Sequence, residues 1–279
     1  MDHRYITREA IGPFIAYLRE EEKSAATQEK YERDIRCFAN FLAGRELTKT
    51  ETVAYKEELS GRYAPASVNS MLVALNAFLR FIDRPDCCVR LLKIQRQMFC
   101  REERELTRQE YQRLVRAAQG TRLSAILQTI CGTGIRISEL QHITVEAVRT
   151  GKAVVSCKNK TRVIFIPAPL QKILRTYSKK NGRTTGPVFV SKKGTPLDRS
   201  NIWRAMKALC RAAGVAPQKV FPHNLRHLFA RLFYSIDKDI VRLADLLGHS
   251  SIDTTRIYTI ETGRQHIARL EQVQRLLIT

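Results

Sequence analysis

The sequence LLGHSSIDTTRIY, residues 246–258, decides how the rest of the chain is interpreted. It places His249 directly after Gly248 and nine positions before Tyr258, on a segment predicted to be a short helix. Tyrosine is an unusual nucleophile, because the pKa of an unperturbed phenol is about 10. It can still form covalent intermediates when its surroundings activate it. The first question is therefore whether the chain supplies cations around a reacting group.

The composition predicts a folded protein that binds a polyanion. The chain has 279 residues, 44% of them hydrophobic, and its 48 Lys and Arg against 27 Asp and Glu give a formal net charge of +21. The apolar fraction is too high for a disordered tail, and a folded protein this basic favours nucleic acid as its partner. A ribosomal protein or a protein that binds anionic membranes would also be basic, so charge alone leaves these classes open.

Cysteine usage and hydropathy favour a cytoplasmic protein, and the motifs that are missing favour one without a cofactor. The seven Cys residues show no disulfide-framework spacing and no C-x-x-C pair, as expected for free thiols in a reducing compartment. The first residues lack the apolar core of a signal peptide, and no apolar run approaches membrane-spanning length. The sequence also contains no Gly-rich phosphate loop and no acidic cluster suited to Mg²⁺.

Residues 1–100 are predicted to form a helical domain that ends in a linker. The clearest apolar stripe at helical spacing comprises Val68, Leu72, Leu75, Leu79 and Ile82. Ser67 is its expected N-cap. A charged stretch from about residue 93 to 105 is typical of a linker, and Thr107 with Glu110 forms a capping-box pattern that opens a new helix. We therefore place the domain boundary near residue 100.

Residues 101–279 are predicted to combine helices with a small sheet. Two β-branched runs, residues 152–157 and 162–166, flank a polar turn and indicate a β-hairpin. Residues 187–191 are expected to form a further short strand, and Ser200 is expected to cap a helix that runs to about Ala213. The predicted fold class is mainly α, with a small antiparallel β-sheet in the second domain.

Two cationic segments precede the tyrosine motif. Arg136 follows the glycine turn at residues 132–134 beside a predicted helix start, where backbone N–H groups favour anions and a guanidinium can bind a phosphate with two hydrogen bonds. Lys158 and Lys160 lie at the predicted hairpin tip, from which a lysine can reach a DNA groove and protonate a leaving oxygen. Taken alone, Arg136 is better explained by a surface pair with Glu139, and the lysines by a solvated turn.

The segment PHNLRH, residues 222–227, brings two histidines and an arginine onto one predicted helix. His223 and Arg226 share a face because they are three positions apart. His223 and His227 are four apart, which is also the spacing of metal ligands. A zinc-protease helix would carry Glu at position 224, and this chain has Asn224, so we expect no metal site.

Taken together, these segments follow the order Arg, Lys, His-x-x-Arg, Gly-His, Tyr. With the local patterns TGxRxSEL, HxLRH and LLGHSSxxTTxxY, the chain resembles the tyrosine recombinase (phage integrase) family over nearly its whole length. The resemblance is closest to the short Xer-like members and mobile-element integrases. It implies a core-type DNA-binding domain with linker over residues 1–100, and a catalytic domain over residues 101–279 that ends in an interaction helix.

The resemblance also implies a role for each site residue. Tyr258 would attack the scissile phosphate and form a 3′-phosphotyrosyl bond. Arg136 and Arg226 would hold the non-bridging oxygens, and His249 would add a hydrogen bond to that phosphate. His223 would assist proton transfer at the tyrosine.

A hairpin lysine would protonate the leaving 5′-oxygen. Counting forward from Gly151 favours Lys158, while the Asn-Lys-Thr-Arg sequence around the turn leaves Lys160 as the alternative. The family often has a glycine between the first lysine and the asparagine, and this chain lacks it. That departure bears on the geometry of the hairpin tip and leaves the other assignments unaffected.

The implied function is site-specific recombination of DNA, either integration and excision of a mobile element or Xer-like dimer resolution. The covalent bond would conserve the energy of the broken phosphodiester, so neither metal nor ATP is required. The implied partners are double-stranded DNA and a homo-tetramer, or a related recombinase, on two DNA sites. The alternatives are a catalytically inactive DNA-binding protein of the same fold and a type IB topoisomerase-like enzyme.

Overall fold

The computed structural model describes residues 5–6, 8–94, 102–157, 160–191, 193–249, 251–258, 267 and 270–275. The chain divides into two compact units, residues 1–96 and 97–279, and each has its own hydrophobic core. The predicted fold class, mainly α with a small antiparallel sheet, is confirmed. Among the helices that the structure describes, none is long and apolar enough to cross a membrane.

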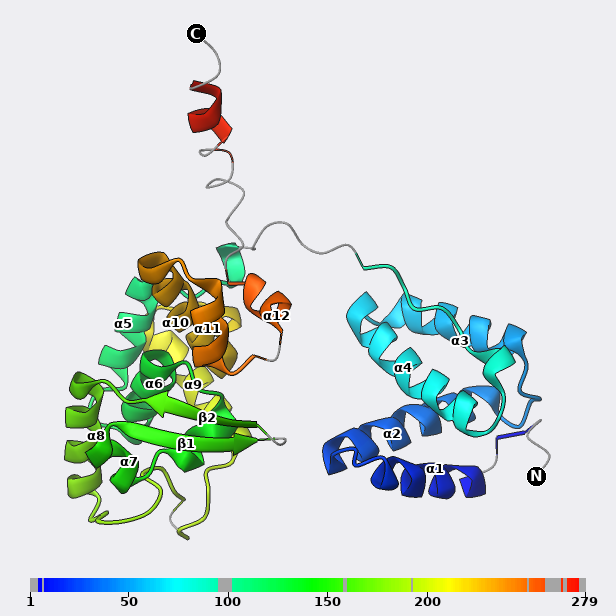
Figure 1. Cartoon of the computed structure of the whole chain (residues 1–279), viewed down its shortest axis with the longest axis horizontal. Coiled ribbons are helices and arrows are strands. Elements are labelled where there is room, and N and C mark those ends of the chain that lie inside the picture. The colour runs from blue at the N-terminus through cyan, green and yellow to red at the C-terminus, as the bar shows by residue number, and fades with distance from the viewer. Residues whose placement is uncertain are drawn as a thin grey trace. The chain divides into compact units, whose positions relative to one another are not determined.

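The N-terminal unit is helical, as predicted (Figure 1). Its elements are α1 (Arg8–Glu20), α2 (Ala25–Leu42), α3 (Lys49–Arg62), α4 (Pro65–Phe81) and the short 3₁₀ helix η1 (Pro85–Cys87). Helix α4 packs against α2 and α3, and α1 packs against α2. All five residues of the predicted stripe from Val68 to Ile82 are buried, so this face of α4 forms the centre of the core.

Helix α6 (Arg122–Thr133) is the central helix of the second unit. It packs against α5 (Arg108–Ala117), α8 (Ala168–Lys180), α9 (Arg199–Ala213) and α10 (Pro222–Asp237), and α10 in turn packs against α11 (Ile240–Leu247). Shorter elements connect them: η2 (Glu102–Arg104), η3 (Ile137–His142), α7 (Val145–Thr150), η4 (Pro217–Lys219) and α12 (Ile252–Arg256).

The predicted capping box at the start of α5 is confirmed. The backbone N–H of Glu110 donates to Thr107 Oγ1 at 3.1 Å, and the backbone N–H of Thr107 donates to Glu110 Oε2 at 2.8 Å. Two N–H groups that the helix itself leaves without partners are therefore satisfied.

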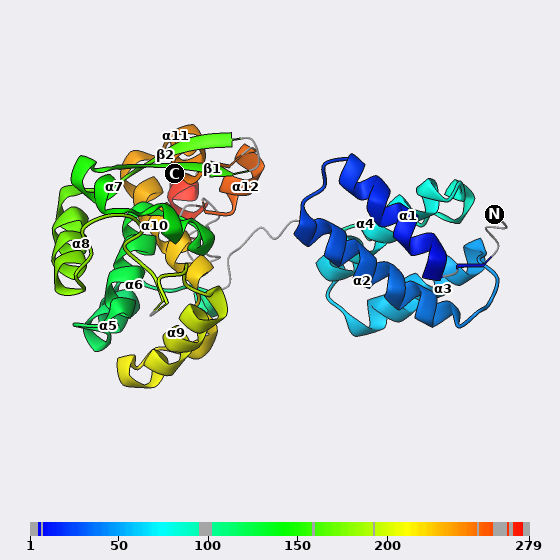
Figure 2. The same ribbon diagram turned by 90° about the horizontal axis from the view of Figure 1, so that it is seen from below.

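The predicted hairpin is also confirmed. Strands β1 (Lys152–Cys157) and β2 (Lys160–Phe165) pair antiparallel, with Lys152 opposite Phe165 and Cys157 opposite Lys160. Residues on one face alternate with those on the other: Ala153, Val155 and Ile164 are buried, while Val154 and Val163 are exposed. The ends of β1 and α12 lie on the same side of the unit in both views (Figures 1 and 2).

The prediction of a strand at residues 187–191 is wrong. The structure has only isolated bridges there, between Thr144 and Pro187 and between Val190 and Pro196. A proline occupies one side of each bridge and cannot donate a backbone hydrogen bond, which stops either ladder from extending. The apolar run is nevertheless buried at Val188, because it covers the core without forming a strand.

Two predicted helix starts are displaced by a few residues. Helix α4 begins at Pro65, with Ala64 rather than Ser67 at the N-cap. Proline suits the first helical position because its fixed φ is helical and its missing N–H would be unpaired there anyway. Helix α9 begins one residue before Ser200, because the carboxylate of Asp198 accepts from the backbone N–H groups of Ser200 and Asn201 at 2.8 and 3.0 Å.

Gly134 ends α6 in a left-handed conformation and turns the chain toward Arg136. A Cβ atom at position 134 would lie 2.4 Å from Cδ1 of Phe229 on α10 and 3.1 Å from Cδ2 of Leu247 on α11. Only glycine allows three helices to approach so closely at this point.

Gly134→Ala should therefore destabilise the second unit. We expect a loss of roughly 2–4 kcal/mol, which combines the strain of an L residue at positive φ with overpacking against Phe229. Urea unfolding followed by the fluorescence of Trp203 measures this, because Trp203 is the only tryptophan in the chain.

Gly120→Ala is the matched control. Gly120 has a similar φ of +77°, but a Cβ there would meet no described atom within 4 Å. Its expected cost is only the backbone strain, about 1 kcal/mol. Equal losses in the two variants would show that the contact with Phe229 contributes nothing.

Candidate active site

Arg226 lies at the centre of the site and is the largest fully buried side chain among the residues that the structure describes, with 2% of its surface exposed. It projects from α10 between the ends of two other helices. Its Nη1 donates to the backbone oxygen of Gly134 at 2.6 Å, and its Nη2 donates to that of Leu247 at 2.7 Å. The same Nη2 lies 2.9 Å from Nε2 of His249.

The charge of Arg226 is not neutralised by a carboxylate. Glu139 pairs with Arg136 and Arg162 instead, and within the described residues no acidic group forms an ion pair with Arg226. Burial, and next the positive charge of Arg136, lower the pKa of Arg226 to about 10, although its interaction with Tyr258 opposes the change. Arg226 therefore stays charged at neutral pH, and a buried cation of this kind favours an incoming anion.

Arg136 provides a second, more accessible guanidinium. It is the N-cap of η3, and its side chain is 44% exposed. Its Nη1 donates to Glu139 Oε1 at 3.1 Å, and its backbone N–H donates to Oε2 of the same residue at 2.8 Å. The pair with Glu139 considered from the sequence is thus present, but the carboxylate is buried rather than on the surface. The Glu139 carboxylate orients the Arg136 side chain toward Gly248, whose backbone oxygen lies 3.5 Å from Nη2 of Arg136.

Glu139 is held as a carboxylate although it is buried. Burial would raise its pKa, but the hydrogen bond from the Arg136 N–H and the charges of Arg162 and Arg136 hold the pKa below its ordinary value. Sequence reasoning did not assign Glu139 to the site, because a carboxylate three residues after an arginine on a helix start is also a common surface pair.

Arg162 was also missed from the sequence. It lies on β2 and donates hydrogen bonds to Glu139 and to the backbone oxygen of Leu246. The second bond connects β2 to the C-terminal end of α11. Its Cδ would lie 2.5 Å from a Cβ at position 248, so the glycine before His249 is required by this contact. The sequence did carry one signal for this role. Arg162 shares a strand face with Ile164 and Ile166, which are buried, so the alternation along the strand predicts a side chain that points toward the core rather than toward solvent.

His249 follows the left-handed C-cap Gly248 and turns its ring into the site. Its Nδ1 lies 2.8 Å from Oγ1 of Thr255, whose side chain is completely buried. Burial, then the charges of Arg226, Arg136 and Arg162, lower the pKa of His249 to about 4. The ring is therefore neutral at physiological pH.

Tyr258 lies in a turn directly after α12 and not on the helix, and only 3% of its surface is exposed. Its ring stacks with His249 at a centroid distance of 5.9 Å and meets His227 edge to face at 4.7 Å. Among the residues that the structure describes, neither the Tyr258 hydroxyl nor Nε2 of His227 has a hydrogen-bond partner. The phenol thus lies beside two imidazoles, and its oxygen faces the Arg226 guanidinium without a hydrogen bond of ordinary length.

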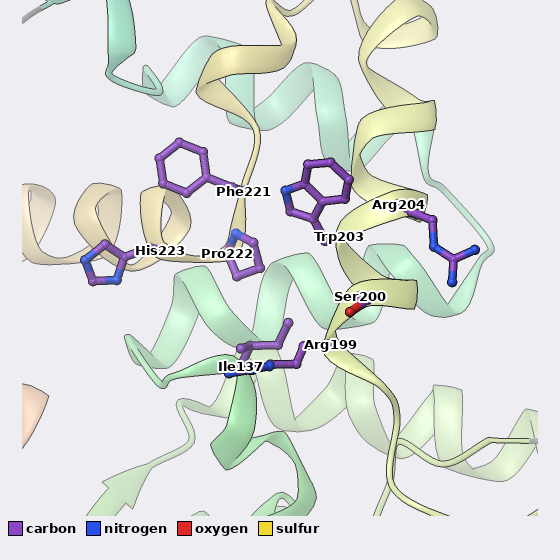
Figure 3. A pocket seen from close by; sticks show the side chains of 8 residues that line it. All are labelled: Ile137, Arg199, Ser200, Trp203, Arg204, Phe221, Pro222 and His223. Atoms are coloured by element: carbon purple, nitrogen blue, oxygen red, sulfur yellow. The ribbon is translucent and has the colours of Figure 1, made fainter. Parts of the chain in front are cut away.

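His223 lies at the start of α10, with its ring centroid 4.5 Å from that of His227. Burial, and then the charges of Arg226 and Arg136, lower the pKa of His223, so it too favours the neutral form. His223 is at one end of an open apolar groove formed with Pro222, Phe221 and Trp203, which Figure 3 shows. Arg199 and Arg204 on α9 supply cations along the same groove.

The structure therefore brings together five of the predicted site residues: Arg136, His223, Arg226, His249 and Tyr258. Lys158 lies outside the described residues, and Lys160 is placed only as the first residue of β2. The choice between the two lysines stays a prediction. Within the described part of the chain, no group of three or more His, Cys, Asp or Glu residues could hold a metal ion.

Comparison with known proteins gives the family. The model of the phage integrase family matches residues 104–264, and that of the phage integrase N-terminal SAM-like domain matches residues 11–84. Tyrosine recombinase XerA of Pyrococcus furiosus is 29% identical over 281 residues, covering 95% of this chain and 93% of that protein. Tyrosine recombinase XerD of Xanthomonas campestris pv. campestris is 30% identical over 296 residues, covering 94% and 90%.

Solved structures agree with this result. The crystal structure of XerA recombinase has a TM-score of 0.53 at 26% identity and covers 98% of this chain and 99% of that chain. A lambda integrase tetramer bound to a Holliday junction has a TM-score of 0.74 at 20% identity, covering 92% and 78%. The chain belongs to the phage integrase family of site-specific tyrosine recombinases, as its motifs predicted.

The three histidines of the site, His223, His227 and His249, make the free energy of unfolding depend on pH. A His whose pKa is lowered in the folded state binds fewer protons there than in the unfolded state. Its contribution to the free energy of unfolding is therefore fully present above about pH 6.5 and is lost as the pH falls. For His227, burial and the charges of His223, Arg226 and His249 lower the pKa to about 4. We expect a loss of about 2 kcal/mol from His227 between pH 7 and pH 5.

Urea unfolding at several pH values, followed by Trp203 fluorescence, tests this. His227→Gln should reduce the loss of stability between pH 7 and 5 by about 2 kcal/mol, while the dependence due to His249 and His223 remains. His142→Gln, outside the site, is the control for the substitution itself. The glutamates of the second unit whose pKa is lowered, Glu110, Glu139 and Glu146, act mainly below this window because their ordinary pKa is 4.5. An unaltered slope in His227→Gln would contradict the assignment.

Proposed function

We propose that the protein cuts and rejoins DNA through a covalent bond between Tyr258 and a 3′-phosphate. The observation that carries the proposal is the buried charge of Arg226, which has no carboxylate partner among the described residues, interacts with the hydroxyl of Tyr258 and lies near the second guanidinium, Arg136. Two guanidiniums next to a nucleophile are suited to a phosphodiester, whose negative charge increases as the nucleophile attacks.

The reaction would run in two balanced steps. The Tyr258 oxygen bonds to phosphorus, the bond from phosphorus to the 5′-oxygen breaks, and that oxygen takes a proton from Lys158 or from the alternative, Lys160. The Tyr258 proton passes to neutral His223 as general base. In the second step, a 5′-hydroxyl gives its proton to the lysine and bonds to phosphorus. The bond from phosphorus to the Tyr258 oxygen breaks, and that oxygen takes its proton back from His223, which restores the phosphodiester.

The remaining residues would act on the phosphate. Arg136 and Arg226 hold its non-bridging oxygens, and His249 donates a hydrogen bond to one of them. Because the phosphotyrosyl bond conserves the energy of the original linkage, rejoining needs neither ATP nor a metal. The protein would act on double-stranded DNA in the cytoplasm.

Assembly is part of the proposal. The lambda integrase named above is a tetramer on a Holliday junction, and we propose a tetramer of this chain, or a complex with a related recombinase, on two DNA sites. Support comes from the C-terminal segment, where Ile267, Leu270 and Val273 are exposed and recur at a spacing that places them on one side of a helix. Such a face is suited to docking on a neighbouring subunit.

The nucleophile is tested by covalent trapping. The full-length protein is mixed with nicked duplex fragments from its own genomic surroundings and run on denaturing gels. We expect a protein–DNA adduct that falls by a factor on the order of 10³ in Tyr258→Phe, while DNA binding in a gel-shift assay is retained. Tyr234→Phe, a tyrosine on α10 in the same unit, should behave as the unmodified protein.

Other outcomes separate the alternatives. Retained cleavage in Tyr258→Phe would exclude this nucleophile. Adducts on every fragment alike would favour a topoisomerase-like enzyme. Tight binding without any adduct, even on fragments that carry the bound site, would favour a catalytically inactive DNA-binding protein.

The tail is tested by truncation after Thr262. We expect binding to a single site to be retained within about threefold, and tetramers on two duplexes to disappear in analytical ultracentrifugation. Val241→Ser, which alters an exposed apolar residue on α11 outside the tail, is the control and should still assemble. Tetramers formed by the truncated protein would contradict the role of the tail.

A further inference from the structure

Thr255 is a completely buried residue that the proposed reaction has not used. Its Oγ1 lies 2.8 Å from Nδ1 of His249, and it precedes Tyr258 by three positions. The adjacent Thr254 is exposed. The hydroxyl of Thr255 therefore joins α12 to the imidazole that lies between Arg226 and Tyr258.

The hydrogen bonds on the two sides of His249 determine where its proton lies. A guanidinium only donates hydrogen bonds, so Nε2 of His249, 2.9 Å from Nη2 of Arg226, must be the acceptor. In a neutral ring the proton then sits on Nδ1, which donates to Thr255 Oγ1. Without DNA, His249 is thus the Nδ1–H tautomer.

Catalysis requires the opposite arrangement. To donate a hydrogen bond to a non-bridging phosphate oxygen, His249 needs a proton on Nε2, the nitrogen that now accepts from Arg226. Protonating the whole ring is unfavourable, since its pKa is held near 4 by burial and the neighbouring arginines. The neutral route moves the proton: Nδ1 gives its proton to water, and Nε2 takes one from water, with no change in charge.

The threonine hydroxyl makes this exchange possible, because a hydroxyl can both accept and donate. It accepts from Nδ1–H in the free protein and rotates to donate to Nδ1 once the proton is on Nε2. No buried nitrogen is left without a partner in either state, which would otherwise be unfavourable. Arg226 keeps its two main-chain acceptors throughout and replaces His249 with a phosphate oxygen.

We propose that Thr255 is a positioning residue that holds Nδ1 of His249 in both tautomers, so that Nε2 can change from acceptor of Arg226 to donor toward the scissile phosphate. The inference rests on the proposed function for its catalytic consequence. The hydrogen bond and the tautomer in the free protein can be tested without it.

The first experiment is spectroscopic and uses the full-length protein, labelled with ¹⁵N-histidine and free of DNA. Long-range ¹H–¹⁵N correlations distinguish Nδ1–H from Nε2–H tautomers. We expect Nδ1–H for His249 in the unmodified protein and in Thr255→Ser, and no change in the matched control Thr254→Val. In Thr255→Val the Arg226 guanidinium still requires Nε2 to accept, but the Nδ1 proton has lost its acceptor, so its signal should shift and exchange faster with water. Identical His249 signals in Thr255→Val and the unmodified protein would overturn the proposal.

The second experiment measures the single-turnover rate of adduct formation on the nicked duplex found by covalent trapping. Thr255→Val should slow the reaction about 10- to 100-fold, Thr255→Ser should restore it to within about threefold, and Thr254→Val should have no effect. In a His249→Ala background, Thr255→Val should cost less than about threefold more, because both changes remove the same interaction.

The double variant separates positioning from packing. An equal loss in both backgrounds would mean that Thr255 acts only through α12 and the placement of Tyr258, which contradicts the proposal. If the unmodified protein forms no adduct at all, the proposed function fails, while the spectroscopic result still decides whether Thr255 holds His249.

Discussion

The burial of one positive charge against main-chain oxygens organises the second unit. Arg226 is held by the carbonyls of Gly134 and Leu247, at the C-terminal ends of α6 and α11. Helix C-termini carry partial negative charge, so they offset a cation without neutralising it. Both ends must come close to α10 for this, which requires glycine at position 134 and a sharp turn at Gly248. The helices are thus arranged around a guanidinium that remains ready for an anion.

The neighbouring charges follow from the same constraint. A single carboxylate, Glu139, receives hydrogen bonds from Arg136 and Arg162, so it holds two further cations in place without reaching Arg226. Burial, and next this surplus of positive charge, keeps His249 neutral. Burial, and then the charges of His223, Arg226 and His249, keep His227 neutral. The site therefore combines fixed cations with neutral imidazoles, which suits binding of a phosphodiester and transfer of single protons.

Local patterns in the sequence predicted the elements well and the contacts between them poorly. The stripe along α4, the capping box at Thr107 and the β1–β2 hairpin depend on neighbouring residues, and all three were predictable. The motif order also identified five residues that meet in the site. Main-chain acceptors for Arg226 and the bridge from Arg162 to α11 leave no local pattern, because they join residues 21 to 92 positions apart. The strand predicted at residues 187–191 was wrong because a proline on each bridge stops the ladder.

The use of main-chain carbonyls to hold Arg226 has a consequence for engineering. A carbonyl group is the same whichever side chain its residue carries, so most substitutions around Arg226 leave its acceptors intact; the exceptions are positions such as Gly134, where the backbone itself would have to move. Helix α9, which presents Arg199, Trp203 and Arg204 along the groove, contributes none of these acceptors. Exposed positions of α9, such as Trp203, can therefore be varied without removing either main-chain acceptor of Arg226.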